Sequence, residues 1–521
     1  MNALAVLTSQ EQFYEQSRQQ FEDIIGCLCS QEVRAMTHSE IERKLEKMGR
    51  ELMRKLLADH LQSRSPGQSD EPVRGADGIE RNNVRLHERS LETIFGTVPV
   101  ERVGYGKKGS PSLHPLDAEL NLPPKRYSFE LCRRVAEEAA KGSFDETLEA
   151  ISKYTGAHVS KRQSEELVRS AAQDFDSFYK MRQGHDAEFK AKGSVLVISV
   201  DGKGVVMRTS DLREQTRKAA KARKHKMGAR LSKGEKKNAK RMATVATVYS
   251  ITPFIREPED LVCENNAEHS KLLRPRPENK RVWASVEKTP QQVIEEAFKE
   301  ASCRDPLHKK SWIALVDGNK HQIRILRSLA REKGIDLTLI VDVIHVAEYL
   351  WDAGRTFYPE SGEELESWVR HRLLEILRGK AGYVAGGIRR SATLRKLSAQ
   401  DRKTVDTCAD YLVTYGQYLK YNHYLDHGYP ISTGVIEGAC RYLVKDRMEI
   451  TGARWSLKGA EAILRLRALR ASGDFDEYWT FHEAQEYDRN HRSLYDGDIV
   501  PPTVKPNTNC NCNRKHLKVV R

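Results

Sequence analysis

Few cysteines and no long apolar run limit what this chain can be. It has nine cysteines in 521 residues, an odd number, and no CxxC pair. This usage predicts reduced thiols in the cytoplasm rather than a disulfide framework. The chain lacks the run of about 18 apolar residues that a transmembrane helix needs, and its start lacks the basic segment of a secretory signal. We therefore expect a cytoplasmic protein with no membrane partner.

Several catalytic signatures are also absent. Gly228 and Gly234 do not have the spacing of a phosphate-binding loop, and Glu235 stands where that loop has its lysine. An HExxH metal helix and a nucleophile elbow do not occur, and Gly202-Lys-Gly204 is too little for a dinucleotide site. The sequence therefore indicates no covalent enzyme intermediate.

Positive charge is abundant and unevenly placed. The chain has 87 Lys and Arg against 73 Asp and Glu, for a net charge of +14, in a composition typical of several globular domains. Residues 208–241 alone hold 14 of these cations and three acidic residues. Such a concentration predicts a polyanionic partner, nucleic acid in the first place, although a solvated lysine-rich loop is the alternative.

Changes in composition and periodicity along the chain predict seven segments. They are N-terminal helices (1–62), a linker (63–82), a DNA-binding region with a β-hairpin around Gly96 and a helix-turn-helix (83–180), an α/β part (190–345) with a basic insertion (208–241), an all-helical insertion (346–430), a segment that completes the α/β part (431–480) and a tail (481–521). Ser39 and Glu42 have the spacing of a capping box for the long helix before residue 60.

The predicted helix-turn-helix lies between residues 143 and 171. Ser143 with Glu146, and Ser160 with Gln163, have capping-box spacing on either side of a short turn. The second helix begins with Lys161, Arg162 and Gln163, side chains of the types that contact phosphates and base edges. An ordinary helical hairpin is the alternative.

Acidic residues follow the apolar strands of the predicted α/β part. Residues 193–200 form a near-continuous apolar run that ends at Asp201, residues 312–316 end at Asp317, and residues 337–341 end at Asp342. Residues 242–251 predict a further strand. Because ligands of such sheets gather at the carboxyl ends of the strands, these carboxylates are candidates for one site.

A third group of charged residues lies far along the chain. Glu437, Arg441 and Lys445 are spaced to share one face of a helix, where Glu437 and Arg441 can also form a simple ion pair. If Glu437 meets Asp201 and Asp317, three carboxylates share one place, which favours a hard cation such as Mg²⁺, with Mn²⁺ as a substitute. Two such ions can bracket a scissile phosphate.

Four sequence blocks carry a resemblance to a known family. They are VISVDGKG (Val197–Gly204), IALVDGNKHQ (Ile313–Gln322), VDVIHVAEYLW (Val341–Trp351) and STGVIEGACRYLVKDRMEITGARWS (Ser432–Ser456). Together they resemble the core motifs of DDE transposases, in the bacterial ISKra-type insertion-sequence branch that is related to Mutator and hAT elements. The resemblance covers about residues 85–480.

The resemblance implies an RNase H-like catalytic fold with a helical insertion before the catalytic glutamate. It implies that Asp201, Asp317 and Glu437 are catalytic and hold the metal, with Arg454 and Trp455 as auxiliary residues. The C/DxxH motif of the branch falls on Asp342 and His345. Asp342 also ends a strand and is therefore a rival to Asp317, and His345 either bonds Asp342 or contacts DNA.

The family's zinc ribbon is not expected here, because residues 106–112 contain no cysteine. Cys27-x-Cys29 and Cys510-x-Cys512 are too closely spaced for that ribbon. Candidate DNA contacts form a larger set. They are Lys161, Arg162, Gln163, Lys218, Lys221, Lys224, Lys226, Arg441 and Lys445.

The sequence thus predicts a nucleoid-associated bacterial transposase that binds terminal inverted repeats, cleaves them with Mg²⁺ and joins the freed 3′-OH to target DNA. Two ends must meet, which implies a homo-oligomer, at least a dimer. Two alternatives stay open: an RNase H-like nuclease without strand transfer, and a domesticated DNA-binding protein without catalysis.

Overall fold

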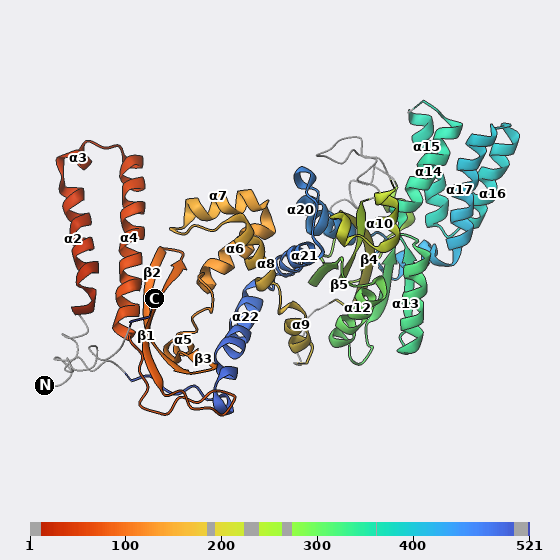
Figure 1. Cartoon of the computed structure of the whole chain (residues 1–521). Coiled ribbons are helices and arrows are strands. Elements are labelled where there is room, and N and C mark those ends of the chain that lie inside the picture. Colours follow the sequence, from red (N-terminus) through yellow and green to blue (C-terminus); the bar gives the residue numbers. More distant parts are fainter. Residues whose placement is uncertain are drawn as a thin grey trace. The chain divides into compact units, whose positions relative to one another are not determined.

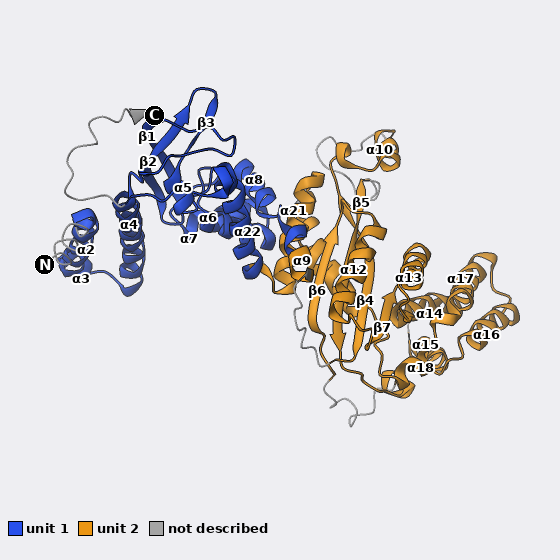
Figure 2. Cartoon of the chain, turned by 90° about the horizontal axis from the view of Figure 1, so that it is seen from below, with its two compact units in different colours: residues 1–178, 476–521 blue, residues 179–475 orange. Residues whose placement is uncertain are grey.

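A computed structural model describes residues 12–184, 193–222, 239–262, 274–360, 362–504 and 519–520. The chain divides into two compact units, Met1–Phe178 together with Asp476–Arg521, and Tyr179–Phe475 (Figure 2). Among the described residues, no helix combines the length and apolar character that crossing a membrane requires.

The first unit begins with helices, as expected. They are η1 (Gln12–Tyr14), α2 (Glu15–Cys29), α3 (Gln31–Arg34) and α4 (His38–Arg64). The capping box of α4 is formed by Thr37 and Glu40, so the prediction of Ser39 and Glu42 is wrong. Thr37 has the extended backbone of an N-cap, whereas Ser39 already lies inside the helix.

A small sheet follows the helices. It consists of β1 (Asn83–Thr93), β2 (Gly96–Lys107), β3 (Ser110–Leu113) and β9 (Val519–Val520), in the order β3-β2-β1-β9. The hairpin predicted around Gly96 is present, because β1 and β2 pair antiparallel from Thr93 opposite Gly96, where Gly96 has a φ of 120°. Val73 is buried against this sheet, so part of residues 63–82, which we expected to be a linker, contributes to the core of this unit.

Five helices follow β3 along the chain. They are α5 (Pro115–Glu119), α6 (Phe129–Lys141), α7 (Phe144–Tyr154), α8 (Lys161–Ala171) and α9 (Phe175–Gly184). Near the C-terminus come α22 (Phe475–Asn490), η8 (Arg492–Leu494) and η9 (Asp496–Asp498). Our boundary at residue 480 therefore lies inside α22, and residues 481–498 are largely helical rather than a tail. These residues return to the core of the first unit, where Tyr495 packs with Val73 and Val103.

A pair of histidines predicts how this unit responds to acid. His87 Nδ1 and His114 Nε2 lie 2.9 Å apart beside Arg102. Burial, and then the charge of Arg102, lowers the pKa of His114 to about 3. Below about pH 6.5 the unfolded chain therefore binds a proton at His114 that the folded chain does not bind. The free energy of unfolding falls as pH falls from there toward 3.

We expect His114→Gln to flatten this acid dependence of stability. Urea unfolding of wild type and variant at pH 5, 6 and 7 measures it, with His38→Gln, the same change on the exposed start of α4, as the control. Equal slopes for wild type and His114→Gln would contradict the prediction.

The second unit contains the predicted α/β sheet. Its strands are β4 (Val195–Val206), β5 (Lys240–Ile251), β6 (Glu278–Ser285), β7 (Ser311–Val316) and β8 (Leu337–Val341), in the order β6-β5-β4-β7-β8. β4 pairs antiparallel with β5 and parallel with β7, and β7 pairs parallel with β8. This mixed sheet, with its first strand in the centre and helices between its strands, confirms the predicted α/β class.

Strand β4 is longer than we predicted. It does not end at Val200 but continues through Asp201 to Val206, paired with β5 over its whole length. Its pairing with β7 stops earlier, at Ser199 opposite Leu315. β6 pairs with β5 as far as Thr244, opposite Gly202, so β4 and β5 form a two-stranded ribbon from Lys203 on. Asp201 lies two residues beyond the last pair of β4 with β7.

Helices cover the sheet and form a separate block (Figure 1). The helices between strands are η2 (Thr209–Asp211), α10 (Glu214–Lys221), η3 (Pro258–Leu261), α12 (Pro290–Arg304) and α13 (Lys320–Glu332). The predicted all-helical block contains α14 (Val343–Phe357), α15 (Glu363–Leu377), α16 (Ala381–Leu394), α17 (Ala399–Tyr415), η5 (Gly416–Tyr418) and α18 (Tyr421–Asp426). The chain then returns to the sheet through α19 (Gly434–Ala439), η6 (Cys440–Lys445), α20 (Asp446–Met448), η7 (Ile450–Gly452) and α21 (Leu457–Ser472).

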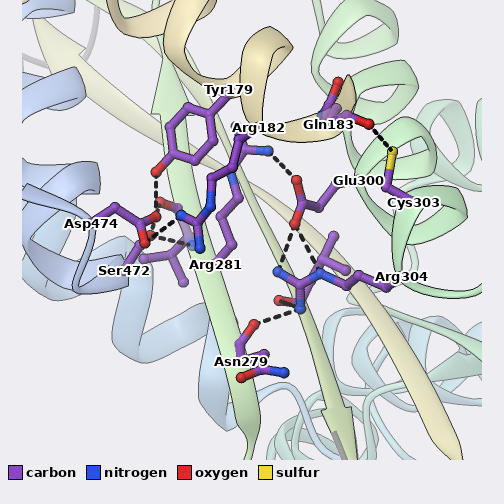
Figure 3. Close-up of polar contacts among 12 residues, drawn as sticks. Tyr179, Arg182, Gln183, Asn279, Arg281, Glu300, Cys303, Arg304, Ser472 and Asp474 are labelled. Atoms are coloured by element: carbon purple, nitrogen blue, oxygen red, sulfur yellow. Dashed lines mark hydrogen bonds and ion pairs between the residues drawn. The ribbon is translucent and has the colours of Figure 1, made fainter. Parts of the chain in front are cut away.

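Strand β6 was not predicted, and its buried charge explains why. Its sequence has few apolar residues and includes the charged Lys280 and Arg281. Arg281 is nevertheless buried, stacked 3.4 Å from the ring centre of Tyr179 and paired with Glu300 of α12 (Figure 3). Glu300 also accepts from Arg304, at 2.7 Å. The charges neutralise one another, so a strand that looks polar in sequence lies inside the unit.

Candidate functional site

Three acidic residues continue the register of the parallel strands. Ser199 pairs with Leu315 on β4 and β7, and Val316 pairs with Val341 on β7 and β8. Two residues beyond the first pair are Asp201 and Asp317, and one residue beyond the second pair are Asp317 and Asp342. The three acidic residues therefore lie at the same end of the sheet, although the pairing of β4 with β7 stops before Asp201 and Asp317.

Asp201 is half-buried in the middle of β4. Its Oδ1 accepts from the backbone N–H of Gly202 at 2.5 Å, and its Oδ2 accepts from the Cys440 thiol, with Sγ 3.1 Å away. Burial, and then the charge of Asp201, raises the pKa of the Cys440 thiol, so Cys440 stays protonated and acts as a donor. The contact ties η6 to the centre of the sheet.

Asp317 stands at the first position after β7, as predicted. Its Oδ1 accepts from the backbone N–H of Asn319 at 3.0 Å, and Asn319 in turn caps α13. Burial raises the pKa of Asp317, and the negative charge of Asp201 raises it further. The charges of Asp201 and Asp317 therefore repel each other, and a cation between them would remove this repulsion.

Asp342 has a different environment, because it is fully buried and fully hydrogen-bonded. Its Oδ1 accepts from the N–H of Ile344 and of Thr433, at 3.1 and 3.2 Å, and its Oδ2 accepts from the Thr433 hydroxyl at 2.6 Å and faces His345 Nδ1 at 3.2 Å. Burial acts to raise the pKa of Asp342, but these hydrogen bonds outweigh it and leave the pKa lowered. Asp342 therefore caps α14 and holds the start of α19.

His345 and Glu437 lie close to Asp342. One ligand atom from each of Asp342, His345 and Glu437 lies within 4.8 Å of the others. The hydrogen bond to Asp342 raises the pKa of His345 to about 9, so this imidazole is protonated at neutral pH. The negative charge of Asp317 also raises the pKa of His345, so this imidazole interacts with both Asp342 and Asp317.

The helix that carries Glu437 is not a continuous α-helix. It changes from α19 to a π-helix over Cys440–Lys445, so the prediction that Glu437, Arg441 and Lys445 share one α-helical face is wrong. The wider turn brings Cys440 against Asp201, while Arg441 faces Asp446 at 3.7 Å. Glu437 and Lys445 are exposed.

Tyrosines of the helical block hold the Asp317 loop, and sequence analysis missed them. Tyr411 donates to the carbonyl of Asp317 at 3.2 Å, and Tyr415 donates to the carbonyl of Gly318. Tyr421 donates to the carbonyl of Val341 at 2.7 Å, just before Asp342. The block therefore fixes the backbone on which two of the acidic residues stand. The signal lay in three tyrosines at spacings of four and six, which look like ordinary core residues.

The auxiliary residues lie at the end of β4. Trp455 is buried, forms a β-bridge with Met207, and donates from Nε1 to the carbonyl of Met448 at 3.1 Å. The guanidinium of Arg447 lies 4.9 Å from its ring centre. Trp455 thus anchors the chain after η6 to the strand of Asp201, and the neighbouring Arg454 is exposed.

The predicted DNA contacts differ in how accessible they are. Both capping boxes around the helix-turn-helix are present. Gln163 Oε1 accepts from Tyr127 at 2.5 Å and from Ser160 at 2.9 Å, so this side chain serves the cap. Lys161 pairs with Asp145 at 2.7 Å, and Arg162 pairs with Glu166 at 3.3 Å although its side chain is 90% exposed. Arg162 therefore has the most exposed side chain of the three.

Part of the basic segment can be located. Lys218 and Lys221 lie in α10, where both are exposed and Lys218 pairs with Glu214 at 2.9 Å. Lys224 and Lys226 lie outside the described residues. The segment leaves the sheet after β4, the strand that carries Asp201.

The donor set suits a hard divalent cation. Asp201, Asp317 and Glu437 offer carboxylate oxygens from three separate elements, and the charge of Asp201 already raises the pKa of Asp317. The oxygens of Asp342 are less available, since each accepts two hydrogen bonds or charged contacts within the protein. Among the described residues, however, the ligand atoms of Asp201, Asp317 and Glu437 do not all lie within 4.8 Å of one another, whereas those of Asp342, His345 and Glu437 do, so Asp317 and Asp342 both stay candidates for the second ligand.

Comparison with known proteins adds little. No protein-family model and no curated protein matches the chain. Among solved structures it is similar to a chain of the Drosophila P element transposase strand transfer complex, with 10% sequence identity and a TM-score of 0.24, over 68% of this chain and 79% of that chain. A similarity this low assigns neither activity nor partner.

Proposed function

We propose that this chain is an insertion-sequence DDE transposase with an RNase H-like core. The observation that supports the proposal is that Asp201 and Asp317 each stand two residues beyond the last pair of β4 and β7, and that Glu437 of α19, more than 100 residues away in sequence, lies close to Asp342 at the end of β8. Carboxylates gather in this way at a place where a hard cation and a phosphate can bind.

Two features of the fold support the proposal. β4, the first strand of the sheet along the chain, lies in its centre. The next two strands, β5 and β6, join on one side by antiparallel pairing, and β7 and β8 join on the other side by parallel pairing. The helical block α14–α18 stands between β8 and α19, directly before Glu437. The helical block agrees with the helical insertion before the catalytic glutamate that the resemblance to DDE transposases implies.

The chemistry divides between the metal ligands and their supports. Asp201, Asp317 and Glu437 would hold Mg²⁺, which when bound as a pair activates the attacking oxygen and stabilises the leaving oxygen of a phosphodiester. The protonated His345 places a positive charge next to these carboxylates, which favours a bound phosphate. Asp342 holds His345 and Thr433, and thereby the start of α19, in place. Water serves as the nucleophile for cleavage, and a DNA 3′-OH serves for joining.

The test uses the DNA that flanks the coding region. Purified protein is incubated with duplexes that carry the flanking inverted repeats and a target plasmid, with Mg²⁺ and, separately, with EDTA. We expect cleavage at the repeat ends and a joined donor–target product, both abolished by EDTA. Cleavage without joining would favour the nuclease, and binding without either product would favour a DNA-binding protein without catalysis. Mass photometry of the DNA complex should show at least a dimer.

The basic segment should bind DNA through charge alone. Changing Lys218, Lys221, Lys224 and Lys226 to alanine should weaken binding to repeat ends and random duplexes alike, because the segment offers cations and few side chains that read bases. The slope of log K against log salt should flatten by about 0.9 for each lysine–phosphate interaction that the change removes. The matched Lys→Arg variant should keep the slope. An unchanged slope in the alanine variant would make the segment a solvated loop.

A further inference from the structure

An open pocket lies immediately beyond the Asp317 loop. It has a volume of about 540 Å³ and lies between α13 and the end of α17 with η5. Its lining residues are Lys320, Ile323, Arg324, Arg327, Ser328, Arg331, Thr414, Tyr415, Gln417 and Tyr418. These ten residues include four cations and no carboxylate, so the pocket is strongly positive.

The four cations form a single stripe on α13. Lys320, Arg324, Arg327 and Arg331 follow one another at spacings of four, three and four, which is the spacing of one helix face. All four are exposed. At a rise of 1.5 Å per residue, the stripe is about 16 Å long. Like charges at such spacings repel and destabilise the helix, unless an anion lies along them.

The hydrogen-bond partners of these cations are not acidic. Arg327 donates to the Tyr418 hydroxyl at 3.0 Å, and Arg324 lies 3.0 Å from His321 Nδ1. Within the residues that the structure describes, none of the four forms an ion pair with a carboxylate. Elsewhere in this unit, arginines such as Arg378 and Arg389 pair with two carboxylates each. The stripe on α13 therefore presents charge that the described part of the protein does not neutralise.

The pocket lies next to the Asp317 loop. Lys320 follows Asp317 by three residues, and Asn319 between them caps α13. Tyr415 lines the pocket and also donates to the carbonyl of Gly318. A DNA strand that runs from the acidic residues toward α13 would contact the stripe next.

We propose that this pocket binds the sugar–phosphate backbone of the DNA strand next to the scissile phosphate. One strand of B-DNA carries a phosphate about every 3.4 Å along the axis and winds around that axis, so a straight stripe of about 16 Å faces a short run of successive phosphates. Tyr415 and Tyr418 supply hydroxyl groups beside the cations. The assignment rests on the proposed function, because it places the scissile phosphate at Asp201, Asp317 and Glu437.

The test compares two triple variants of equal charge. Arg324→Gln, Arg327→Gln and Arg331→Gln together remove the stripe but leave Lys320 near the metal site. Lys299→Gln, Arg390→Gln and Lys403→Gln remove three exposed cations of the same unit from other helices. Binding to a labelled repeat-end DNA is measured by fluorescence anisotropy in EDTA across a salt series, so no cleavage is needed. Thermal melting checks that both proteins fold.

We expect the stripe variant to bind at least about tenfold more weakly and to have a salt slope that is flatter by about two to three units, since three cations no longer neutralise phosphates. The control variant should bind like wild type. Phosphate ethylation interference should disappear within about five nucleotides of the cleavage position in the stripe variant only. The variant with lysine at the three arginine positions should recover the salt slope.

Other outcomes overturn the assignment. If both triple variants weaken binding equally, the stripe is ordinary surface charge. If ATP or pyrophosphate competes as well as an oligonucleotide at equal phosphate concentration, the pocket takes a small phosphate ligand rather than DNA. These outcomes differ from a failure of the proposed function, in which wild-type protein would bind repeat ends but neither cleave nor join them.

Discussion

Asp201→Asn, Asp317→Asn and Glu437→Gln should each lower cleavage of a repeat-end duplex by about 10³-fold or more. Each change keeps the size of the side chain and removes one charge from the set that would hold Mg²⁺. Metal stabilisation of a phosphoryl transition state is worth several kcal/mol, and each 1.4 kcal/mol is about tenfold in rate. The rate is measured in single turnovers with excess protein, alongside a gel shift that should remain close to wild type.

Two further variants sharpen this result. Asp336→Asn is the matched control, because Asp336 is exposed and precedes β8, at the end of the strand opposite Asp342. It should cleave like wild type. Asp342→Asn should instead lower the melting temperature, because this buried carboxylate accepts from Ile344, Thr433 and His345. Wild-type cleavage by Asp317→Asn together with a folded but inactive Asp342→Asn protein would give the second catalytic position to Asp342.

The sheet itself was largely predictable from sequence. Four of its strands are apolar runs, and the acidic residues after β7 and β8 stand where the runs stop. That Asp201, Asp317 and Asp342 lie at the same end of the sheet follows from the parallel direction of β4, β7 and β8, which sequence can suggest. The length of β4 could not be predicted, because Asp201-Gly-Lys-Gly204 has the composition of a turn. It is extended because β5 offers a partner for every residue as far as Val206.

The supports of the site were much harder to predict. The π-helix after Glu437 changes which residues share a face, and no local sequence signal marks it. The hydroxyl donors Tyr411 and Tyr415 act on the backbone of a loop nearly 100 residues away. Such contacts depend on how the helical block packs against the sheet, which a single sequence does not specify. The same holds for β6, whose buried Arg281 is acceptable only because α12 supplies Glu300.

Glu300→Gln should destabilise the second unit by about 3–5 kcal/mol, the usual cost of breaking a buried ion pair. Glu300 is 5% exposed and lies between Arg281 and Arg304, which are also buried. The change takes from two buried guanidinium groups the carboxylate that both contact. Arg304 keeps its bonds to the carbonyls of Val248 and Asn279, and Arg281 keeps the faces of Tyr179 and Trp283.

The pH dependence gives an independent measure of the same interaction. Burial acts to raise the pKa of Glu300, but Arg281 and Arg304 outweigh it and hold the pKa at about 2. Because the folded pKa lies below the unfolded one, the stabilisation is complete above about pH 4.5 and is lost as pH falls toward 2. By linkage the shift corresponds to roughly 3 kcal/mol, which agrees with the mutational estimate.

The control is Glu296→Gln, one turn earlier on α12. Glu296 pairs with Lys288 at 2.5 Å, but both side chains are partly exposed, so the change should cost less than about 1 kcal/mol. Urea unfolding at pH 7 and pH 3, followed by tryptophan fluorescence, compares wild type with the two variants. Wild type and Glu296→Gln should both lose stability between these pH values more steeply than Glu300→Gln, which no longer carries the titrating group. If Glu300→Gln is as stable as Glu296→Gln at pH 7, the charges around Arg281 are solvated in the native protein, and β6 must be held by its backbone ladder with β5 alone.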